Sequence, residues 1–290
     1  MRNLKQTEGE KAFAVVNYIF LTLVSLLTLY PFLYVLSASF SDPDSVITEK
    51  VLLFPRGLTL EAYEKVLSTK GIWIAYGNTI FYTLVGATVS MIITICGAYP
   101  LSKKRLMGRK IITFFVAFTM WFGAGMIPFY LNIKSLGLID SRLGIIIAFA
   151  CGAFYVILLR TYFQSIPESM EESAKIDGAN DLVILTKIIL PLSTPALATI
   201  GLYYAVERWN GYFWSMILLK DINKIPLQVL LKKLVVEMNV SEEMMRDTQT
   251  FNKETIIYTT IVVSVIPIVA VYPYIQKYFV KGIMIGSIKG

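Results

Sequence analysis

The sequence predicts an all-α membrane protein with six transmembrane helices. Of its 290 residues, 56% are hydrophobic and only 16% are charged, and the mean hydropathy is +0.62. Soluble domains are about 45–50% apolar and about 25% charged, and disordered chains combine low hydrophobicity with high charge. The long uncharged stretches are continuously apolar and do not alternate, which favours helices over a β-barrel.

Six stretches are long enough to span a bilayer, because a helix needs about 20 apolar residues to cross the hydrocarbon layer. The predicted spans are 13–36, 76–101, 111–132, 143–163, 194–219 and 255–279. The first is about twice as long as the apolar core of a signal peptide, so we expect an uncleaved helix. The fourth is short, but Arg142 and Arg160 at its ends can snorkel. No long Pro- or Ser-rich linker divides the chain, so residues 1–290 are expected to form one membrane domain.

The distribution of basic residues predicts the orientation. The loop 101–110, LSKKRLMGRK, carries five positive charges, which favours a cytoplasmic position. Both termini and the loop 164–193 are then cytoplasmic, and the loops 37–75 and 220–254 are extracytoplasmic. We interpret the net charge of +7 as orienting charge beside anionic membrane lipid and expect no nucleic acid partner.

The histidine and cysteine content of the chain argues against catalysis and metal binding. The chain has no His, which removes the commonest metal ligand and the usual general base. The two cysteines, Cys96 and Cys151, do not support a disulfide framework. We therefore expect no catalytic residues and no metal site.

The cytoplasmic loop contains the signals of two short helices joined by a turn. Pro167 is followed by acidic residues, which suit the first turn of a helix. Gly178 can end that helix, and Asn180 or Asp181 can cap a second one that runs to Pro191. Such an element can be gripped by another protein, although an ordinary connecting loop is the alternative.

The spacing within this loop resembles a known motif, Glu–Ala–Ala–x3–Gly–x9–Ile–x–Leu–Pro. The matching residues are Glu172, Ser173, Ala174, Gly178, Ile188, Leu190 and Pro191. This is similar to the coupling loop (EAA motif) of permease subunits in ATP-binding-cassette (ABC) importers. Ser173 departs from the family's usual Ala, and both residues are small.

The resemblance extends over nearly the whole chain. The six-span plan resembles the type I permeases for carbohydrates, and the closing YFVKGIMIGSIKG resembles the tail of maltose-importer permeases. ERWNGYFW, residues 207–214, is similar to a stretch that often follows the coupling loop in sugar permeases. FSDPDSVI, LFPRGLTLEAY and MWFGAGMIPFYL look most like permeases for complex oligosaccharides, including alginate oligosaccharides.

The resemblance implies the partners. Such a permease pairs with a second, homologous permease. Two ATPase subunits bind the pair on the cytoplasmic side, and an extracytoplasmic solute-binding protein delivers the sugar. ATP and Mg are used by the ATPase subunits; this chain has no G-x4-G-K-[ST] phosphate loop, so we expect it to bind no cofactor. ATP-driven closure would move the helix at 172–178 together with the spans, as a switch between inward and outward access. The loop 220–254, with a predicted helix near 226–237 and a cap at Ser241, would meet the binding protein.

Charged and aromatic residues within the predicted spans are the candidates for lining a substrate path. Ionisable residues inside a span are functional suspects, and only Glu207 and Arg208 lie deep within a predicted span. Glu207 can face the path and Arg208 can snorkel outward, or either can satisfy a neighbouring helix. Aromatic faces that can stack on sugar rings, and an amide for their hydroxyls, complete the candidate set: Trp209, Asn210, Tyr212, Trp214, Trp121 and Tyr130. An interfacial aromatic belt is the alternative interpretation.

Three competing functions remain open at this point. A type I permease for a non-sugar solute has the same coupling loop. An ion-coupled secondary carrier commonly needs several buried carboxylates, and this chain offers only Glu207. An intramembrane enzyme would need clustered Asp, His or Ser–Lys groups, which the apolar spans lack.

Overall fold

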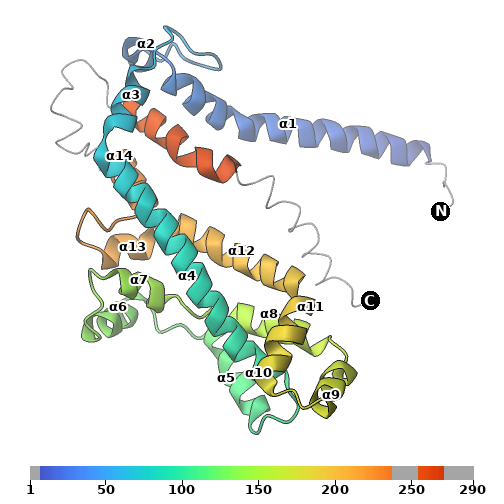
Figure 1. The fold of residues 1–290 in the computed structure, drawn as a ribbon. Helices are drawn as coiled ribbons and strands as arrows, with labels where there is room; N and C mark the ends of the chain where they lie inside the picture. The colour runs from blue at the N-terminus through green and yellow to red at the C-terminus, as the bar shows by residue number, and fades with distance from the viewer. Residues whose placement is uncertain (1–6, 237–253, 271–290) are drawn as a thin grey trace. The chain divides into compact units, whose positions relative to one another are not determined.

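The computed structural model describes residues 7–236 and 254–270, and every regular element in these ranges is helical (Figure 1). The all-α prediction is therefore confirmed for the described residues. They fall into two compact units. Residues 7–70 form the first together with 233–236 and 254–266, and residues 71–232 form the second together with 267–270.

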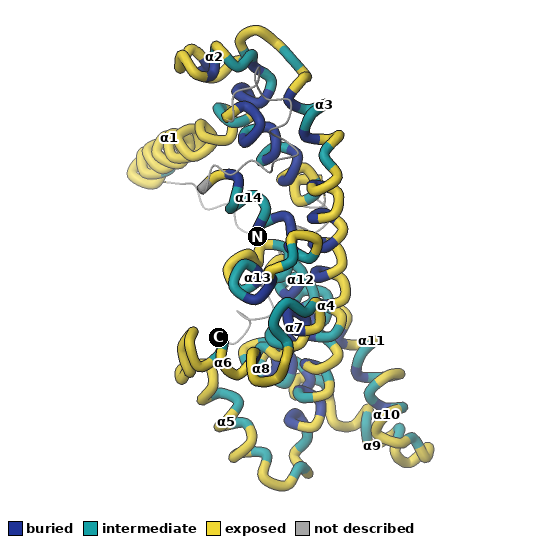
Figure 2. The backbone as a smooth tube through the Cα atoms, turned by 90° about the vertical axis from the view of Figure 1, so that its left-hand side faces the viewer, coloured by how far each residue is buried: buried dark blue, intermediate teal, exposed yellow. Residues whose placement is uncertain are grey.

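The first unit contains α1 (Glu8–Ser39), α2 (Pro43–Ile47), α3 (Glu61–Ser68) and most of the helix Glu254–Ala270. Thr7 and Glu10 form a capping box at the start of α1, which satisfies two of its free N–H groups. The apolar residues of α1 are exposed along the helix (Figure 2). A helix that is apolar all round and exposed is suited to lipid or to another apolar partner.

The end of α1 is the packed part of the first unit. Ser37 Oγ donates to the Leu53 carbonyl at 2.6 Å, and Ser39 Oγ is 2.7 Å from Tyr63 Oη of α3. Thr259 Oγ1 of the last described helix donates to the Ser39 carbonyl at 3.3 Å. These bonds connect α1, the loop after it, α3 and the helix Glu254–Ala270. Within the loop 37–75, the amphipathic pattern of residues 60–68 predicts a short helix, and the structure confirms it as α3.

The second unit is built around one long helix, α4 (Lys70–Ser102), which belongs to this unit from Gly71 onward. Its other elements are α5 (Arg109–Trp121), α6 (Met126–Ser135), α7 (Arg142–Ala148), α8 (Ala153–Gln164), α9 (Glu168–Ile176), α10 (Asp181–Ile184), η1 (Leu185–Ile189), α11 (Leu190–Leu192), α12 (Thr194–Asn210), α13 (Phe213–Leu218) and the start of α14 (Leu227–Val236). The element η1 is one turn of π-helix. The predicted helix near 226–237 is confirmed as α14, whereas Ser241 lies outside the described residues.

Three predicted spans differ from the structure, because each consists of separate helices. The segment 111–132 is α5 and α6, bent by 116°, and 143–163 is α7 and α8, bent by 52°. The segment 194–219 is α12 and α13, and α12 makes a further angle of 83° with Asp181–Leu192. Glycines lie at the first two breaks, including Gly125 with φ +85° and Gly152.

Two described helices, α1 and α4, are each long and apolar enough to cross a membrane, and there are up to five such spans if each bent pair counts as one. The helix Glu254–Ala270 covers the start of the predicted sixth span, and residues 271–279 lie outside the described ranges. The six-span topology and the single membrane domain stay predictions.

Two buried apolar clusters hold the second unit together, and α4 contributes to both. The first combines α4, α8, α10–α11 and α12 and includes Ala98, Leu159, Ile184 and Ile200. The second combines Tyr82 of α4 with residues of α6, α7, α13 and α14. Because α4 is shared, a shift of this helix would disturb the packing of both clusters.

A polar clamp closes the connection between α6 and α7. Asp140 adopts a left-handed conformation with φ +54°. Its Oδ1 accepts the backbone N–H groups of Lys220 and Asp221, each at 3.0 Å, and its Oδ2 accepts Lys224 Nζ at 3.0 Å. These bonds, the backbone ones foremost, lower the pKa of Asp140 from 3.8 to about 2. The clamp fixes the loop after α13 to the loop before α7.

This pKa predicts how the clamp depends on pH. A lowered pKa contributes stability that is complete above the ordinary value and is lost as pH falls through the folded value. The amides of Lys220 and Asp221 are therefore expected to show the same protection from hydrogen exchange at pH 4.5 and pH 7.5, after correction for the intrinsic rate. Asp140→Ala should remove this protection at both pH values. Wild-type protection that declines between pH 7.5 and 4.5 would contradict the assignment.

Candidate functional site

The segment 167–192 forms the two helices and turn that the sequence predicts. The first helix, α9, follows Pro167 and has Glu168 and Glu171 in its first turn, where the helix dipole favours negative charge. Gly178 has φ +80°, a conformation that costs a residue with a side chain about 1–2 kcal/mol. The Asn180 side chain then accepts from the Val183 N–H at 2.9 Å and caps α10.

The second helix ends at Leu192, one residue beyond the predicted end at Pro191, so the chain stays helical through this proline. Proline has no N–H and its ring collides with the carbonyl four residues earlier in a regular α-helix. The π-helical turn Leu185–Ile189 comes directly before, and the Leu190 N–H bonds to the Leu185 carbonyl five residues back. The π-helical turn therefore directly precedes Pro191, and the helix does not end there.

The predicted coupling residues divide between surface and core. Glu172 and Ser173 are exposed on α9, and Gly178 and Pro191 are also exposed. Ala174 and Leu190 pack against the first apolar cluster, and Ile188 is half-buried. Exposed apolar side chains on the same segment are Met170, Ile176 and Leu182. Ala174 and Leu190 thus anchor the segment to the first apolar cluster, and its exposed side carries both polar and apolar side chains.

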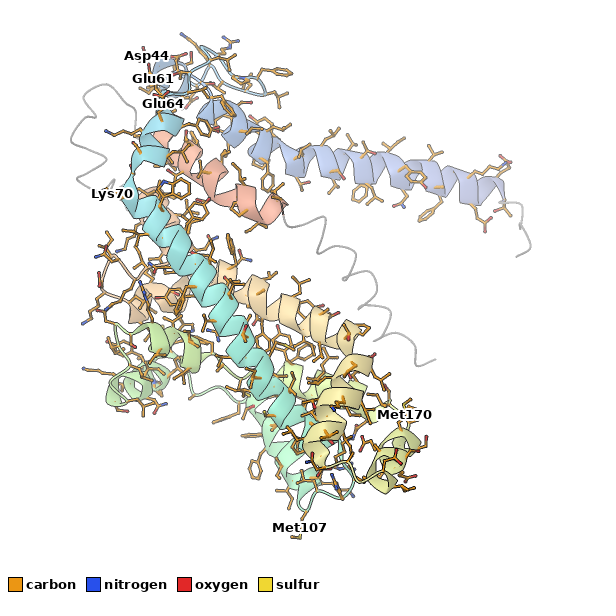
Figure 3. The ribbon with its side chains drawn as sticks, in the orientation of Figure 1. Asp44, Glu61, Glu64, Lys70, Met107 and Met170 are labelled. Atoms are coloured by element: carbon orange, nitrogen blue, oxygen red, sulfur yellow. The ribbon has the colours of Figure 1, made fainter. Side chains whose placement is uncertain are left out.

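The loop after α4 lies beside this segment. Its Met107 and the Met170 of α9 occupy the same end of the second unit (Figure 3). Three ion pairs join the two elements: Lys103 with Glu171, Lys104 with Glu168, and Arg105 with Asp181. The hydrogen bond from Lys104 lowers the pKa of Glu168.

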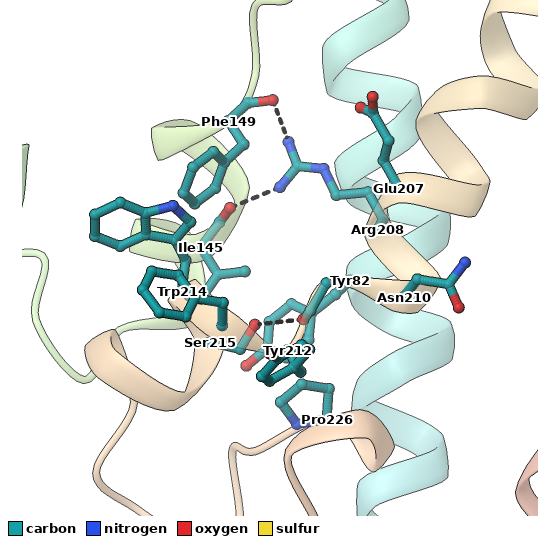
Figure 4. Close-up of a pocket in the computed structure, with 12 residues that line it drawn as sticks. Tyr82, Ile145, Phe149, Glu207, Arg208, Asn210, Tyr212, Trp214, Ser215 and Pro226 are labelled. Atoms are coloured by element: carbon teal, nitrogen blue, oxygen red, sulfur yellow. Dashed lines mark hydrogen bonds between the residues drawn. The ribbon is translucent and has the colours of Figure 1, made fainter. Parts of the chain in front are cut away.

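A second site is a cavity of about 310 Å³ between α4, α7, α12 and α13 (Figure 4). Four of the predicted path residues line it: Glu207, Asn210, Tyr212 and Trp214. Arg208, Gly211 and Ser215 also line it, and no sequence signal points to the remaining lining residues, Tyr82, Ile145, Phe149, Phe213 and Pro226. Five of the twelve lining residues are aromatic and a few carry polar groups, a mixture that is common in binding pockets for small molecules.

Three predicted path residues lie elsewhere. Trp121, at the end of α5, is 86% exposed. Tyr130 of α6 packs against the second apolar cluster. Trp209 is half-buried on α12 and does not line the cavity. Its Nε1 is buried without a hydrogen-bond partner among the described residues.

Arg208 binds the broken helix α7–α8, so of the two alternatives for this residue the structure supports contact with a neighbouring helix and not outward snorkelling. Its Nη1 donates to the Ile145 carbonyl at 2.7 Å, and its Nη2 donates to the carbonyls of Ile146 at 3.0 Å and Phe149 at 2.6 Å. Nη2 also lies 3.1 Å from Ser90 Oγ of α4. The last carbonyls of a helix have no partner within the helix. The guanidinium supplies donors for them at the point where α7 ends.

Tyr204, one turn earlier on the same face of α12, binds the other side of the break. The Gly152 N–H, just before α8, donates to Tyr204 Oη at 3.1 Å, and Thr94 Oγ1 of α4 lies 2.7 Å from the same oxygen. A side chain at Gly86 of α4 would approach Arg208 Nε to 3.0 Å. Because residues four apart lie on the same face of a helix, the sequence already indicated that Tyr204 and Arg208 point in the same direction.

Glu207 points away from Arg208's partners and accepts the Tyr155 hydroxyl at 2.6 Å. The two adjacent charges on α12 thus have different partners, in agreement with the expectation that neighbours on a helix do not face each other. Among residues 7–236 and 254–270, no three His, Cys, Asp or Glu side chains gather closely enough to hold a metal ion.

Comparison with known proteins gives matches over nearly the whole chain. The family model described as "Binding-protein-dependent transport system inner membrane component" matches residues 9–285. The polygalacturonan/rhamnogalacturonan transport system permease protein YtcP of Bacillus subtilis (strain 168) is 44% identical, over 97% of this chain and 99% of that protein. The maltodextrin transport system permease protein MdxG of the same organism is 26% identical, over 95% and 96%. A crystal structure of a bacterial ABC transporter involved in the import of the acidic polysaccharide alginate contains a similar chain. It is 49% identical, with a TM-score of 0.91, and the match covers 96% of this chain and 100% of that one.

The Arg208 contacts predict a large loss of stability on substitution. Arg208→Lys keeps the charge but replaces a planar five-donor group with a single ammonium. Buried carbonyls left without donors cost about 1–3 kcal/mol each, so we expect Arg208→Lys to lose more than about 2 kcal/mol. Thermal unfolding of the detergent-solubilised protein measures this loss.

The matched control is Glu207→Gln, on the adjacent residue, which keeps an acceptor for the Tyr155 hydroxyl. It should unfold within a few degrees of wild type. An Arg208→Lys protein as stable as wild type would show that the carbonyls at the break do not depend on this side chain.

Proposed function

The chain belongs to the family of binding-protein-dependent transport system inner membrane components, and from this we propose that it forms an oligosaccharide path together with a second, homologous permease. It is the non-catalytic permease subunit of an ABC importer in the inner membrane. Two ATPase subunits lie on the cytoplasmic side, one of them binds the segment 167–192, and a solute-binding protein delivers the sugar on the opposite side. The membrane is the cytoplasmic membrane of a bacterium, with both termini of the chain on the cytoplasmic side.

The observation that supports ATPase binding most strongly is the construction of the segment 167–192. It is anchored by Ala174 and Leu190 and exposes Met170, Ile176 and Leu182, which are apolar side chains that soluble surfaces rarely gather without a partner. Glu172 and Gly178 lie on the exposed part, where the coupling motif requires contact with another protein. The basic loop 101–110 beside it favours the cytoplasmic side, where ATP is available.

Oligosaccharides are the cargo that the relatives and the cavity favour. The relatives are named for the transport of polygalacturonan and rhamnogalacturonan, of maltodextrin and of alginate. In the cavity, the rings of Tyr212 and Trp214 can stack on sugar faces and Asn210 can bind hydroxyl groups. Polysaccharide fragments are therefore a better fit than small ionic solutes.

The outward loops supply the surface for the binding protein. The Asp140 clamp and the bonds from α4 fix the start of the loop 220–254 to the second unit. The loop 37–75 carries α2 and α3 in the first unit. A binding protein that meets fixed loop ends loses less conformational freedom on docking than one that meets a disordered chain.

Uptake by the assembled complex in proteoliposomes tests the proposal. Labelled oligosaccharides prepared from polygalacturonan and from alginate are the probes. ATP-dependent, vanadate-sensitive uptake that requires the binding protein supports the proposal. Uptake without the ATPase subunits that collapses when an ionophore is added would identify a secondary carrier and contradict it.

Gly178 gives a sharper prediction for the coupling role. A side chain at Gly178 meets no atom within 4 Å, and Asp tolerates a left-handed conformation better than most residues. Gly178→Asp is therefore expected to leave the protein folded in the membrane while its carboxylate obstructs the ATPase contact. We expect uptake to fall by about tenfold or more, equivalent to about 1.4 kcal/mol of lost interaction.

The matched control is Gly137→Asp, because Gly137 also has a left-handed backbone (φ +69°) and open space around its Cα, but lies between α6 and α7. It should transport at close to the wild-type rate. Normal ATP-coupled uptake by Gly178→Asp, measured at equal membrane content, would refute the assigned role.

A further inference from the structure

The three ion pairs between the loop after α4 and the segment 167–192 differ greatly in burial. The side chains of Lys103 and Glu171 are only 13% and 14% exposed. The side chains of Lys104 and Glu168 are 76% and 64% exposed, and those of the Arg105–Asp181 pair are about half exposed. Exposed pairs contribute little, whereas removal of one partner from a buried pair leaves an uncompensated charge. Among the three pairs, the loss of Lys103–Glu171 is therefore expected to weaken the contact between the loop after α4 and α9 most.

Lys103, the residue after the end of α4, also contacts that helix. Its Nζ lies 4.5 Å from the centroid of the Tyr99 ring, one turn earlier on α4, in a cation–π arrangement. Tyr99 is itself buried in the first apolar cluster. Lys103 is thus fixed to the core on one side and to α9 on the other.

The same end of α4 is held by α8. The Arg160 Nε donates to the Leu101 carbonyl at 3.0 Å, and the Gln164 Nε2 donates to the Ser102 carbonyl at 3.4 Å. These side chains satisfy carbonyls that a helix end leaves free. The end of α4 is therefore a defined attachment point and not a frayed terminus.

Along its length, α4 carries contacts to the other functional parts of the second unit. Ser90 and Thr94 bond to Arg208 and Tyr204 at the broken helix beside the cavity. Toward the other end, three α4 residues bond the loop that precedes α14 and the first residue of α14. The Asn78 Nδ2 donates to the Asn223 carbonyl at 2.8 Å, Tyr82 Oη donates to the Lys224 carbonyl at 2.8 Å, and the Leu227 N–H donates to Thr79 Oγ1 at 2.8 Å.

A continuous helix of 33 residues is about 50 Å long. A displacement at its Lys103 end reaches the cavity and the outer loop without a flexible connection between them, because packed helices move as rigid bodies. The chain itself joins α9 to the membrane helices on its N-terminal side through the short turn Ser165–Pro167 after α8.

We infer that the largely buried Lys103–Glu171 pair is the connection through which movement of α9 is transmitted to α4, and through α4 to the cavity wall and the outer loop. Lys103 is a positioning residue, since it touches neither cargo nor nucleotide and acts through Glu171 and Tyr99. This inference rests on the proposed docking of ATPase subunits at α9. It adds a path by which ATP-driven closure reaches the far side of the subunit.

Charge reversal tests the connection in the complete complex, reconstituted with its second permease, ATPases and binding protein. Lys103→Glu and Glu171→Lys are each expected to lower the amount of oligosaccharide imported per ATP hydrolysed by about tenfold or more. The double variant K103E/E171K restores opposite charges and should recover at least about half of the wild-type ratio. The matched control is the exposed pair, for which Lys104→Glu and Glu168→Lys should stay within about twofold of wild type.

The ratio of uptake to hydrolysis distinguishes this role from a merely structural one. A structural role would lower assembly, hydrolysis and uptake together, and the ratio would stay unchanged. If Lys103→Glu does not assemble, Lys103→Met and Glu171→Gln replace the reversals, and the same fall in the ratio is expected. An unchanged ratio in assembled variants, or no recovery in K103E/E171K, overturns the inference. A wild-type complex without binding-protein-dependent uptake would instead refute the proposed function, so the two failures are distinguishable.

Discussion

The second unit depends on hydrogen bonds that a broken helix needs and cannot make by itself. Within a membrane, backbone carbonyls and N–H groups have no water to bind, so irregular backbone persists only where side chains or other protein groups satisfy it. The break between α7 and α8 meets this requirement through α12, because Arg208 binds three carbonyls at the end of α7 and Tyr204 accepts the Gly152 N–H before α8. The positions of α4, α7, α8 and α12, and with them the aromatic cavity, follow from this arrangement.

The same arrangement explains why one helix can serve two distant regions. α4 contributes Ser90 and Thr94 to the hydrogen bonds at the break, Tyr99 and Ala98 to one apolar cluster and Tyr82 to the other. At its end it meets α9 through a largely buried ion pair. The segment that is proposed to bind the ATPase and the loop that is proposed to meet the binding protein are therefore attached to one rigid element. Alternating access needs such an element, since a ligand at one site can affect another only through a structure that both contact.

The sequence predicted those features whose signals are local. Pro167, Gly178 and Asn180 lie at the start, turn and cap of the two helices in segment 167–192, and the structure has them in those roles. The helix breaks were missed, because an uncharged composition indicates burial in lipid but says nothing about continuity. The sequence left the direction of Arg208 open for a different reason, since its partners are backbone carbonyls about 60 residues away. Of the aromatic candidates, Trp214 and Tyr212 line the cavity and Trp121 does not, a difference that depends on tertiary packing alone.

Cross-linking from the exposed surface of α9 shows whether the segment 167–192 binds an ATPase subunit. Ser173→Cys places a thiol on the exposed side of α9, in a chain whose two exposed native cysteines, Cys96 and Cys151, are replaced by Ala. Ser135→Cys, on the exposed end of α6, is the matched control. In a complex that retains transport, a short bifunctional thiol reagent with cysteines on the ATPase surface should link Ser173→Cys to the ATPase and leave Ser135→Cys unlinked. A transporting complex in which Ser173→Cys forms no such link, or in which both positions link equally, would show that α9 is not the surface that binds the ATPase.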